Sequence, residues 1–205
     1  MFLQVIQGRT SDPEAARAAM DRWMREVQPG SIGFLGSTLG ITDDGRFIAI
    51  ARFESADAAA RNGSRPEQTR WWEETRQLFD GEPTFLDSED VDLDLVGDPD
   101  RAGFVQVMQG QVSDPARARE LMASMPADLM KEFRPDILGT VMIGHDEGRW
   151  TQVIYFTSEA EARANERKEP PEEWRSVMDE LMSLGIGDVD YLDLRRPMLL
   201  TPKES

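Results

Sequence analysis

The 205-residue chain contains no cysteine and only one histidine. The absence of cysteine excludes disulfide bonds, thiol nucleophiles and thiolate metal ligands, and it is typical of a reducing compartment, so we expect a cytoplasmic protein. A single histidine without any cysteine predicts no transition-metal site. We also expect no cofactor, and the sequence offers no motif that assigns a catalytic residue.

Long apolar runs and an excess of positive charge are also missing. The longest apolar runs span only a few residues, which argues against a transmembrane helix. The amino-terminal sequence MFLQVIQG lacks the basic and apolar regions of a signal peptide. The formal net charge is −16, from 39 acidic and 23 basic residues. A surface this negative repels phosphate backbones and anionic lipids, so we expect neither a nucleic-acid nor a membrane partner.

What the chain does contain is an internal repeat. Residues 2–13 read FLQVIQGRTSDP and residues 104–115 read FVQVMQGQVSDP, with eight of twelve positions identical at a constant offset of 102. Such self-similarity indicates a duplicated domain. We therefore predict a first repeat at residues 1–96, a linker at 97–103, a second repeat at 104–196 and a frayed tail at 197–205.

Both repeats show the same order of predicted elements. An alternating strand comes first, and either Asp12 with Pro13 or Ser11 with Glu14 marks the start of a helix. A hairpin and a second, interrupted helix follow, and a strand at 85–95 ends the first repeat. This order is β-α-β-β-α-β, the ferredoxin-like split unit, whose four-stranded antiparallel sheet carries both helices on one face.

The other face of each sheet then needs a cover. If each strand directs about two apolar side chains to that face, burying roughly eight of them is worth roughly 10–25 kcal/mol. A typical domain has a total stability of only about 5–15 kcal/mol. The predicted fold class is therefore α+β, with two ferredoxin-like repeats packed sheet to sheet as a pseudo-dimer within one chain. Further self-association of such chains stays open.

Three stretches in each repeat resemble the dimeric α+β barrel superfamily, and most strongly a tandem, fused form of its antibiotic-biosynthesis-monooxygenase-like branch. They are the opening strand, the Ala-rich segments ARFESADAAARN and IYFTSEAEARAN, and the Trp-bearing second helix. The resemblance implies a small enzyme that oxidises polycyclic aromatic phenols with molecular oxygen, without metal or flavin, in a cleft between sheet and helices. The alternative is a non-catalytic ligand-binding or stress-associated protein, because fold does not imply function.

Eight residues are candidates for lining a pocket that holds a small apolar or aromatic molecule: Gln7, Asn62, Trp71 and Trp72 in the first copy, and Gln109, Tyr155, Asn165 and Trp174 in the second. Gln4 and Gln106 occupy the same opening strands as the candidate glutamines. Each candidate also has a structural interpretation. Asparagine suits a helix end, tryptophan at helical spacing suits a core, and a buried amide needs hydrogen-bond partners in any case.

The two copies differ at three aligned pairs: Trp72 and Arg175, Arg52 and Tyr155, and Asp43 and His145. These differences predict that at most one cleft is active. We expect His145 to be exposed at its hairpin. We also expect Asp94 and Asp193, which lie in matched LDL triplets, to face solvent rather than to form an acid–base pair.

Overall fold

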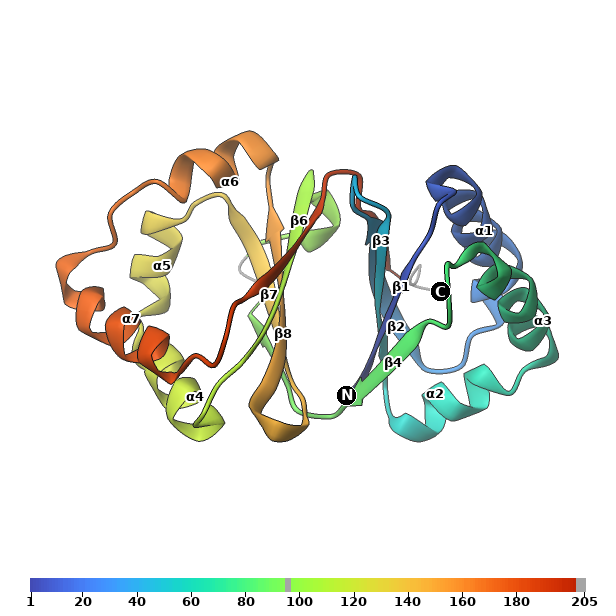
Figure 1. The fold of residues 1–205 in the computed structure, drawn as a ribbon, viewed down its shortest axis with the longest axis horizontal. Helices are drawn as coiled ribbons and strands as arrows, with labels where there is room; N and C mark the ends of the chain where they lie inside the picture. Colours follow the sequence, from blue (N-terminus) through green and yellow to red (C-terminus); the bar gives the residue numbers. More distant parts are fainter. Residues whose placement is uncertain (95–96, 202–205) are drawn as a thin grey trace. The chain divides into compact units, whose positions relative to one another are not determined.

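The computed structural model describes residues 1–94 and 97–201. The chain divides into two compact units. The first comprises Met1–Val91 together with the end of the chain from Arg196, and the second comprises Asp92–Arg195. Each unit contains one five-stranded sheet, with its helices on one face of that sheet (Figure 1). No helix in the described part of the chain is both long and apolar enough to cross a bilayer.

The sheet of the first unit has the strand order β10-β2-β3-β1-β4. In chain order they are β1 (Phe2–Arg9), α1 (Pro13–Glu26), β2 (Phe34–Ile41), β3 (Arg46–Phe53), α2 (Ala56–Gly63), α3 (Pro66–Thr75), β4 (Thr84–Ser88) and β10 (Met198–Leu200).

The second unit has the sheet order β5-β7-β8-β6-β9. Its elements are β5 (Val91–Asp94), β6 (Phe104–Gln111), α4 (Pro115–Ser124), α5 (Ala127–Phe133), β7 (Ile137–Gly144), β8 (Arg149–Phe156), α6 (Glu159–Asn165), α7 (Glu172–Leu184) and β9 (Asp190–Leu194).

Four strands of each sheet have the ferredoxin-like order. The orders are β2-β3-β1-β4 and β7-β8-β6-β9, and the neighbours within each set pair antiparallel. The predicted α+β class and the two ferredoxin-like repeats are thus confirmed. On β1, Phe2 and Ile6 pack under the helices. Leu3 and Val5 alternate with them and therefore lie on the face of the sheet that carries no helices. Packing of the two opposite faces against each other stays a prediction.

The fifth strand of each sheet comes from the other half of the sequence. β5 follows β4 along the chain but lies beside β7, and β10 follows β9 but pairs with β2. This corrects the prediction of one strand at 85–95, because the chain turns after β4, where the Asp90 N–H donates to Ser88 Oγ at 3.0 Å. It also corrects the frayed tail for Met198–Leu200. Leu95, Val96 and residues 202–205 lie outside the described residues.

The helix starts follow the Asp-Pro signal in both repeats. Asp12 accepts a hydrogen bond from the Ala15 N–H at 2.9 Å, and Asp114 accepts one from the Arg117 N–H at 3.0 Å. The apolar spacing of Leu121, Met125 and Leu129 predicts one helix after Pro115. This prediction is wrong, because Pro126 cannot donate a helical hydrogen bond and separates α4 from α5. The first helix of the second repeat is therefore shorter than α1.

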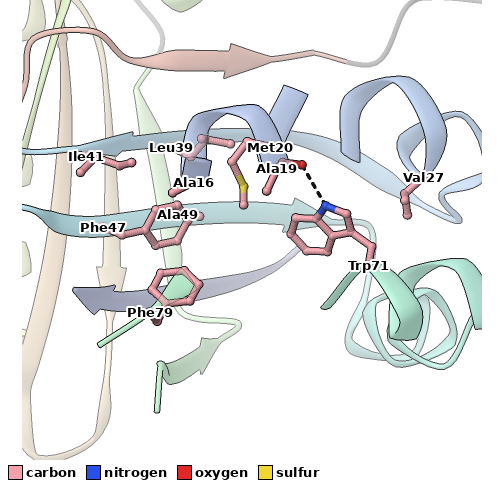
Figure 2. Close-up of a cluster of buried hydrophobic side chains, with 10 residues drawn as sticks. All are labelled: Ala16, Ala19, Met20, Val27, Leu39, Ile41, Phe47, Ala49, Trp71 and Phe79. Atoms are coloured by element: carbon pink, nitrogen blue, oxygen red, sulfur yellow. Dashed lines mark hydrogen bonds between the residues drawn. The ribbon is translucent and has the colours of Figure 1, made fainter. Parts of the chain in front are cut away.

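The core of the first unit lies between its sheet and its helices. Figure 2 shows ten of its buried side chains, including Trp71 from α3, Phe47 from β3 and Phe79. The Trp71 indole donates to the carbonyl oxygen of Ala19 in α1 at 2.9 Å (Figure 2). This one side chain thus joins two helices to each other as well as filling the core.

Candidate functional site

A cavity of about 490 Å³ opens in the second unit. It is lined by Gln106, Met108, Arg134, Ile154, Phe156, Arg163, Glu166, Tyr191 and Asp193. Ile154 and Phe156 pack with Ala162 of α6, so the cavity lies on the helix-bearing face of the sheet. Its volume falls within the range of small-molecule sites, about 300–1,000 Å³.

The floor of the cavity is formed by two polar side chains on the sheet, Gln106 and Asp193. Gln106, on β6, is 5% exposed and donates through Nε2 to Oδ1 of Asp193 on β9 at 2.9 Å. The other carboxylate oxygen of Asp193 accepts a hydrogen bond from Nη2 of Arg163 on α6. Both oxygens of Asp193 are therefore held, and its carboxylate has a fixed position.

Two guanidinium groups lie at the ends of an aromatic stack beside this floor. The Phe104 and Phe156 rings stack with centroids 5.7 Å apart and an interplanar angle of 26°. Arg134 lies over the Phe156 ring at 5.4 Å, and Arg163 lies over the Phe104 ring at 5.3 Å. Such cation–π contacts fix the planes of both guanidinium groups.

Each guanidinium also has carboxylate partners. Arg134 binds Asp136 through Nε at 3.0 Å and Nη2 at 2.8 Å, and the Asp136 side chain is only 1% exposed. Arg163 Nη1 lies 3.2 and 3.1 Å from the two carboxylate oxygens of Glu166. Partial burial acts to lower the pKa of Arg163, but the Glu166 hydrogen bond and the charge of Asp193 outweigh it, so the pKa is raised.

Behind these residues, Glu159 of α6 is tied to Arg195, with Nε–Oε2 2.8 Å and Nη2–Oε1 2.9 Å. That hydrogen bond holds the pKa of Glu159 below its ordinary value, against a smaller opposing effect of burial. A depressed carboxylate pKa contributes stability that is present above the unfolded value, about 4.3. This contribution is lost as the pH falls through the folded value.

We therefore expect Arg195→Gln to raise the pKa of Glu159 toward its ordinary value and to weaken the acid-side pH dependence of stability. A carboxyl NMR titration measures the first effect, and urea unfolding at several pH values measures the second. Arg175→Gln is the control, because Arg175 pairs with Glu169 outside the cavity. An unchanged Glu159 titration in Arg195→Gln would contradict the assignment.

The corresponding region of the first unit is occupied by aromatic side chains. The register of the strands shows which positions of the two sheets are equivalent. Ile154 corresponds to Ala51, Phe156 to Phe53, Met108 to Ile6 and Tyr191 to Phe85. Trp23 packs against the cluster that contains Phe53, with Ala51 at its edge. The Trp72 ring lies 5.4 Å from that of Phe85, edge to face. Trp23 thus packs against the counterpart of Phe156, while Trp72 contacts the counterpart of Tyr191, Phe85, which is 46% exposed.

The charged residues of the cavity differ between the repeats as well. At the offset of 103 that relates β2 to β7 and α2 to α6, Arg134 and Asp136 correspond to Ser31 and Gly33, and Arg163 and Glu166 correspond to Ala60 and Gly63. The polar pair of the floor is shared, since Gln4 Nε2 donates to Asp87 Oδ1 at 2.9 Å. The second unit therefore adds four charged groups to a common Gln–Asp pair.

No protein-family model and no curated protein sequence matches the chain. Solved structures do resemble it. A protein of Lactobacillus acidophilus, provisionally named a monooxygenase, is 12% identical with a TM-score of 0.74, over 98% of this chain and 95% of that one. One from Fusobacterium nucleatum, named in the same way, is 11% identical with a TM-score of 0.73, over 98% and 94%. An anthrone oxidase-like protein is 12% identical with a TM-score of 0.68, over 97% and 92%.

The chain has the fold of tandem monooxygenase-like proteins. These matches extend over nearly the whole of both chains, so they include both repeats. The likeness confirms the fold that the sequence resemblance implied. Among the described residues of this chain, no group of three or more His, Asp or Glu side chains is arranged to hold a metal ion.

Of the four sequence candidates in the first unit, Trp71 and Trp72 contact each other, with ring centroids 6.0 Å apart. Asn62 is 4% exposed, and its Oδ1 accepts a hydrogen bond from Arg65 at 2.9 Å. Trp71 is in the core, and Trp72 is half-buried against Phe85. Gln7 lies on β1 on the face away from the helices, because it alternates with helix-facing residues. The structure does not bring these four side chains to one cleft.

The candidates of the second unit also lie outside the cavity. Gln109 donates to Thr151 Oγ1 at 3.0 Å, and Tyr155 is buried on the same face of the sheet. Asn165 donates to the carbonyl oxygen of Glu161 at 2.9 Å, as a residue at a helix end does. Trp174 is buried, with its ring 5.5 Å from that of Phe133. None of the eight candidates is among the residues that line this cavity.

Two further expectations are corrected. His145 is half-buried rather than exposed, with Nε2 3.0 Å from Thr151 Oγ1. Asp193 lines the cavity rather than facing solvent, whereas Asp94 is exposed as predicted. The matched LDL triplets were misleading, because the structural counterpart of Asp193 is Asp87, opposite Gln4. The repeated opening strand, with Gln106 at the place of Gln4, is the sequence signal that could have indicated this pair.

Proposed function

We propose that the cavity of the second unit is the active site of a small-molecule oxygenase that acts on a flat, weakly acidic aromatic or polyketide-like substrate. The observation that carries the proposal is the contrast between the repeats. The second unit has an open cavity with a fixed Gln106–Asp193–Arg163 floor and an apolar wall. In the first unit, Trp23 packs against Phe53, the counterpart of Phe156, and Trp72 contacts Phe85, the counterpart of Tyr191. We therefore propose one active cleft per chain.

The proposed reaction needs an acidic substrate and molecular oxygen. A proton leaves the substrate for a carboxylate, and the resulting carbanion or phenolate transfers an electron to oxygen. Recombination of the two radicals forms a carbon–oxygen bond, and the resulting peroxide anion takes the proton back from the carboxyl group to give a hydroperoxide. Loss of water then leaves one oxygen atom as a new carbonyl group, while the other oxygen leaves in the water. Oxygen is the oxidant, and no further reductant is required.

Asp193 is the carboxylate we propose as the proton acceptor. It lies on the rigid sheet beside the apolar wall, and its position is fixed by Gln106 and Arg163. Carboxylates are weak bases, so a substrate with an acidic O–H or C–H is required. Arg163 can in turn stabilise the negative charge that forms on the substrate. Anthrone-like ketones and polycyclic phenols have this acidity.

The test is oxygen consumption with a panel of anthrones and polycyclic phenols, with ¹⁸O₂ used to trace the new carbonyl oxygen. We expect turnover with at least one substrate class and incorporation of one labelled atom. Ile154→Trp fills the cavity and is expected to lower turnover by about tenfold or more. Met182→Trp is the control, because Met182 is 77% exposed and outside the cavity. Binding without oxygen consumption would favour the non-catalytic ligand-binding alternative instead.

A further inference from the structure

We infer that the cavity of the second unit recognises a carboxylate on its ligand, which takes the place of Glu166 on Arg163. The inference rests on the proposed function to the extent that this cavity must be the ligand site. It adds the charged group by which the ligand is held, and so names the substrate class as flat aromatic carboxylic acids.

Arg163 is held in position from the side of the sheet, and Glu159 Oε1 is a further carboxylate oxygen, 3.7 Å from its Nη2. The Phe104 ring and the Asp193 carboxylate hold its guanidinium from the side of the sheet. The hydrogen bonds that it makes to Asp193 and Glu166 involve its two terminal nitrogens. A guanidinium has five N–H bonds arranged to match a carboxylate. Arg163 can therefore bind a ligand carboxylate and keep Asp193 as its fixed partner.

Glu166 is the partner that can be exchanged. It is the residue that ends α6, and its side chain is 34% exposed. An ion pair at this level of exposure contributes only about 0–1 kcal/mol, so its displacement costs little. Asp193 differs because it lies on a strand and also accepts a hydrogen bond from Gln106. The Glu166 carboxylate thus occupies the place that a ligand carboxylate would take on Nη1.

Arg134 places a second guanidinium group beside the cavity. Arg134 is bound by Asp136, whose side chain is 1% exposed, so this partner cannot swing away. Its Nε and Nη2 hold Asp136, and Arg134 also lines the cavity. A buried ion pair is costly to form, and the first unit has Ser31 and Gly33 at these two positions. The positive charge at both ends of the stack is thus specific to the repeat with the open cavity.

The apolar wall defines the rest of the ligand. Met108, Ile154 and Phe156 line the cavity between the two arginines. A flat ring system can lie on these side chains while its carboxylate contacts Arg163. A neutral amide of the same shape would contact the same wall but could not replace the charge of Glu166.

The test is isothermal titration calorimetry with 2-naphthoate and its neutral isostere 2-naphthamide, on the full chain and four variants. We expect 2-naphthoate to bind about tenfold more tightly than 2-naphthamide. Arg163→Gln should remove this preference. If that variant does not fold, Arg163→Lys should reduce the preference, because lysine keeps the charge but cannot bind a carboxylate through two nitrogens. Glu166→Gln should strengthen 2-naphthoate binding by about threefold or more, because a competing carboxylate is lost. Glu169→Gln is the matched control and should change neither affinity.

The outcomes distinguish failure of the carboxylate inference from failure of the proposed oxygenase function. Equal binding of the acid and the amide overturns the inference but leaves the cavity as the ligand site. Weaker binding of 2-naphthoate to the Glu166→Gln variant overturns the proposal that the ligand carboxylate replaces Glu166 on Arg163. Tighter binding of ionised 2-naphthol than of 2-naphthoate assigns the recognised oxyanion to a phenolate and overturns the carboxylate. If no probe binds and the oxygen-consumption panel is also inactive, the proposed function fails together with the inference.

Discussion

Asp193→Asn is expected to lower the rate of oxygen consumption by about 100-fold or more. The amide has nearly the same shape as the carboxylate but cannot accept a proton. The position of the residue should be preserved, because the amide oxygen can still accept from Arg163, and Gln106 can turn its own amide so that Oε1 accepts from the new N–H group. Steady-state oxygen consumption with the best substrate of the panel measures the effect, and ligand titration shows whether binding is retained.

The first repeat supplies a matched control for this variant. Asp87 occupies the same register position as Asp193 and accepts the same kind of hydrogen bond, from Gln4 at 2.9 Å. Because Trp23 packs against Phe53, where Phe156 lines the cavity of the second unit, we expect Asp87→Asn to leave the rate within about twofold of the unchanged chain. Equal losses in the two variants would contradict the assignment of activity to the second unit.

Trp71→Ala is expected to lower the free energy of unfolding by about 3–5 kcal/mol. Trp71 is 9% exposed, and its ring centroid lies 6.3 Å from that of Trp23 and 6.0 Å from that of Trp72. Its truncation leaves a cavity in the core of the first unit and removes the hydrogen bond to Ala19 (Figure 2). Urea unfolding followed by circular dichroism measures the change.

Ligand affinity distinguishes the core role of Trp71 from a role in a pocket. At a temperature where Trp71→Ala remains folded, we expect it to bind ligand as the unchanged chain does, because the cavity belongs to the second unit. Trp71→Phe keeps most of the ring volume, so it should recover most of the lost stability. Loss of binding with unchanged stability would instead support Trp71 as a pocket residue.

Much of the fold could be predicted because its signals are local. The repeated opening strand and the Asp-Pro helix starts each depend on a few neighbouring residues, and the structure confirms them. The fifth strands could not be predicted in the same way. Val91–Asp94 and Met198–Leu200 are short, and the sheet that each one joins depends on contacts with residues far along the chain.

The site was harder to predict than the fold because neighbouring strand residues point to opposite faces. Gln106 and Gln109 lie on one strand, and the sequence does not reveal which of them lies beneath the helices. The structure places Gln106 at the cavity and Gln109 on the other face. Arg163 and Glu166 were missed because they have no counterpart in the first repeat, so a search for matched residues passes over them.

The central claim is that ligand binds in the cavity of the second unit. It is tested most directly by a methyl NMR titration of the full chain, labelled at Met and Ile, with 2-naphthol as the ligand. The account predicts that the methyl signals of Met108 and Ile154 shift with added ligand, since both line the cavity. Those of Met20 and Ile6, which pack in or against the core of the first unit, should stay in place. Shifts at Ile6 and Met20 with none at Met108 and Ile154 would contradict it.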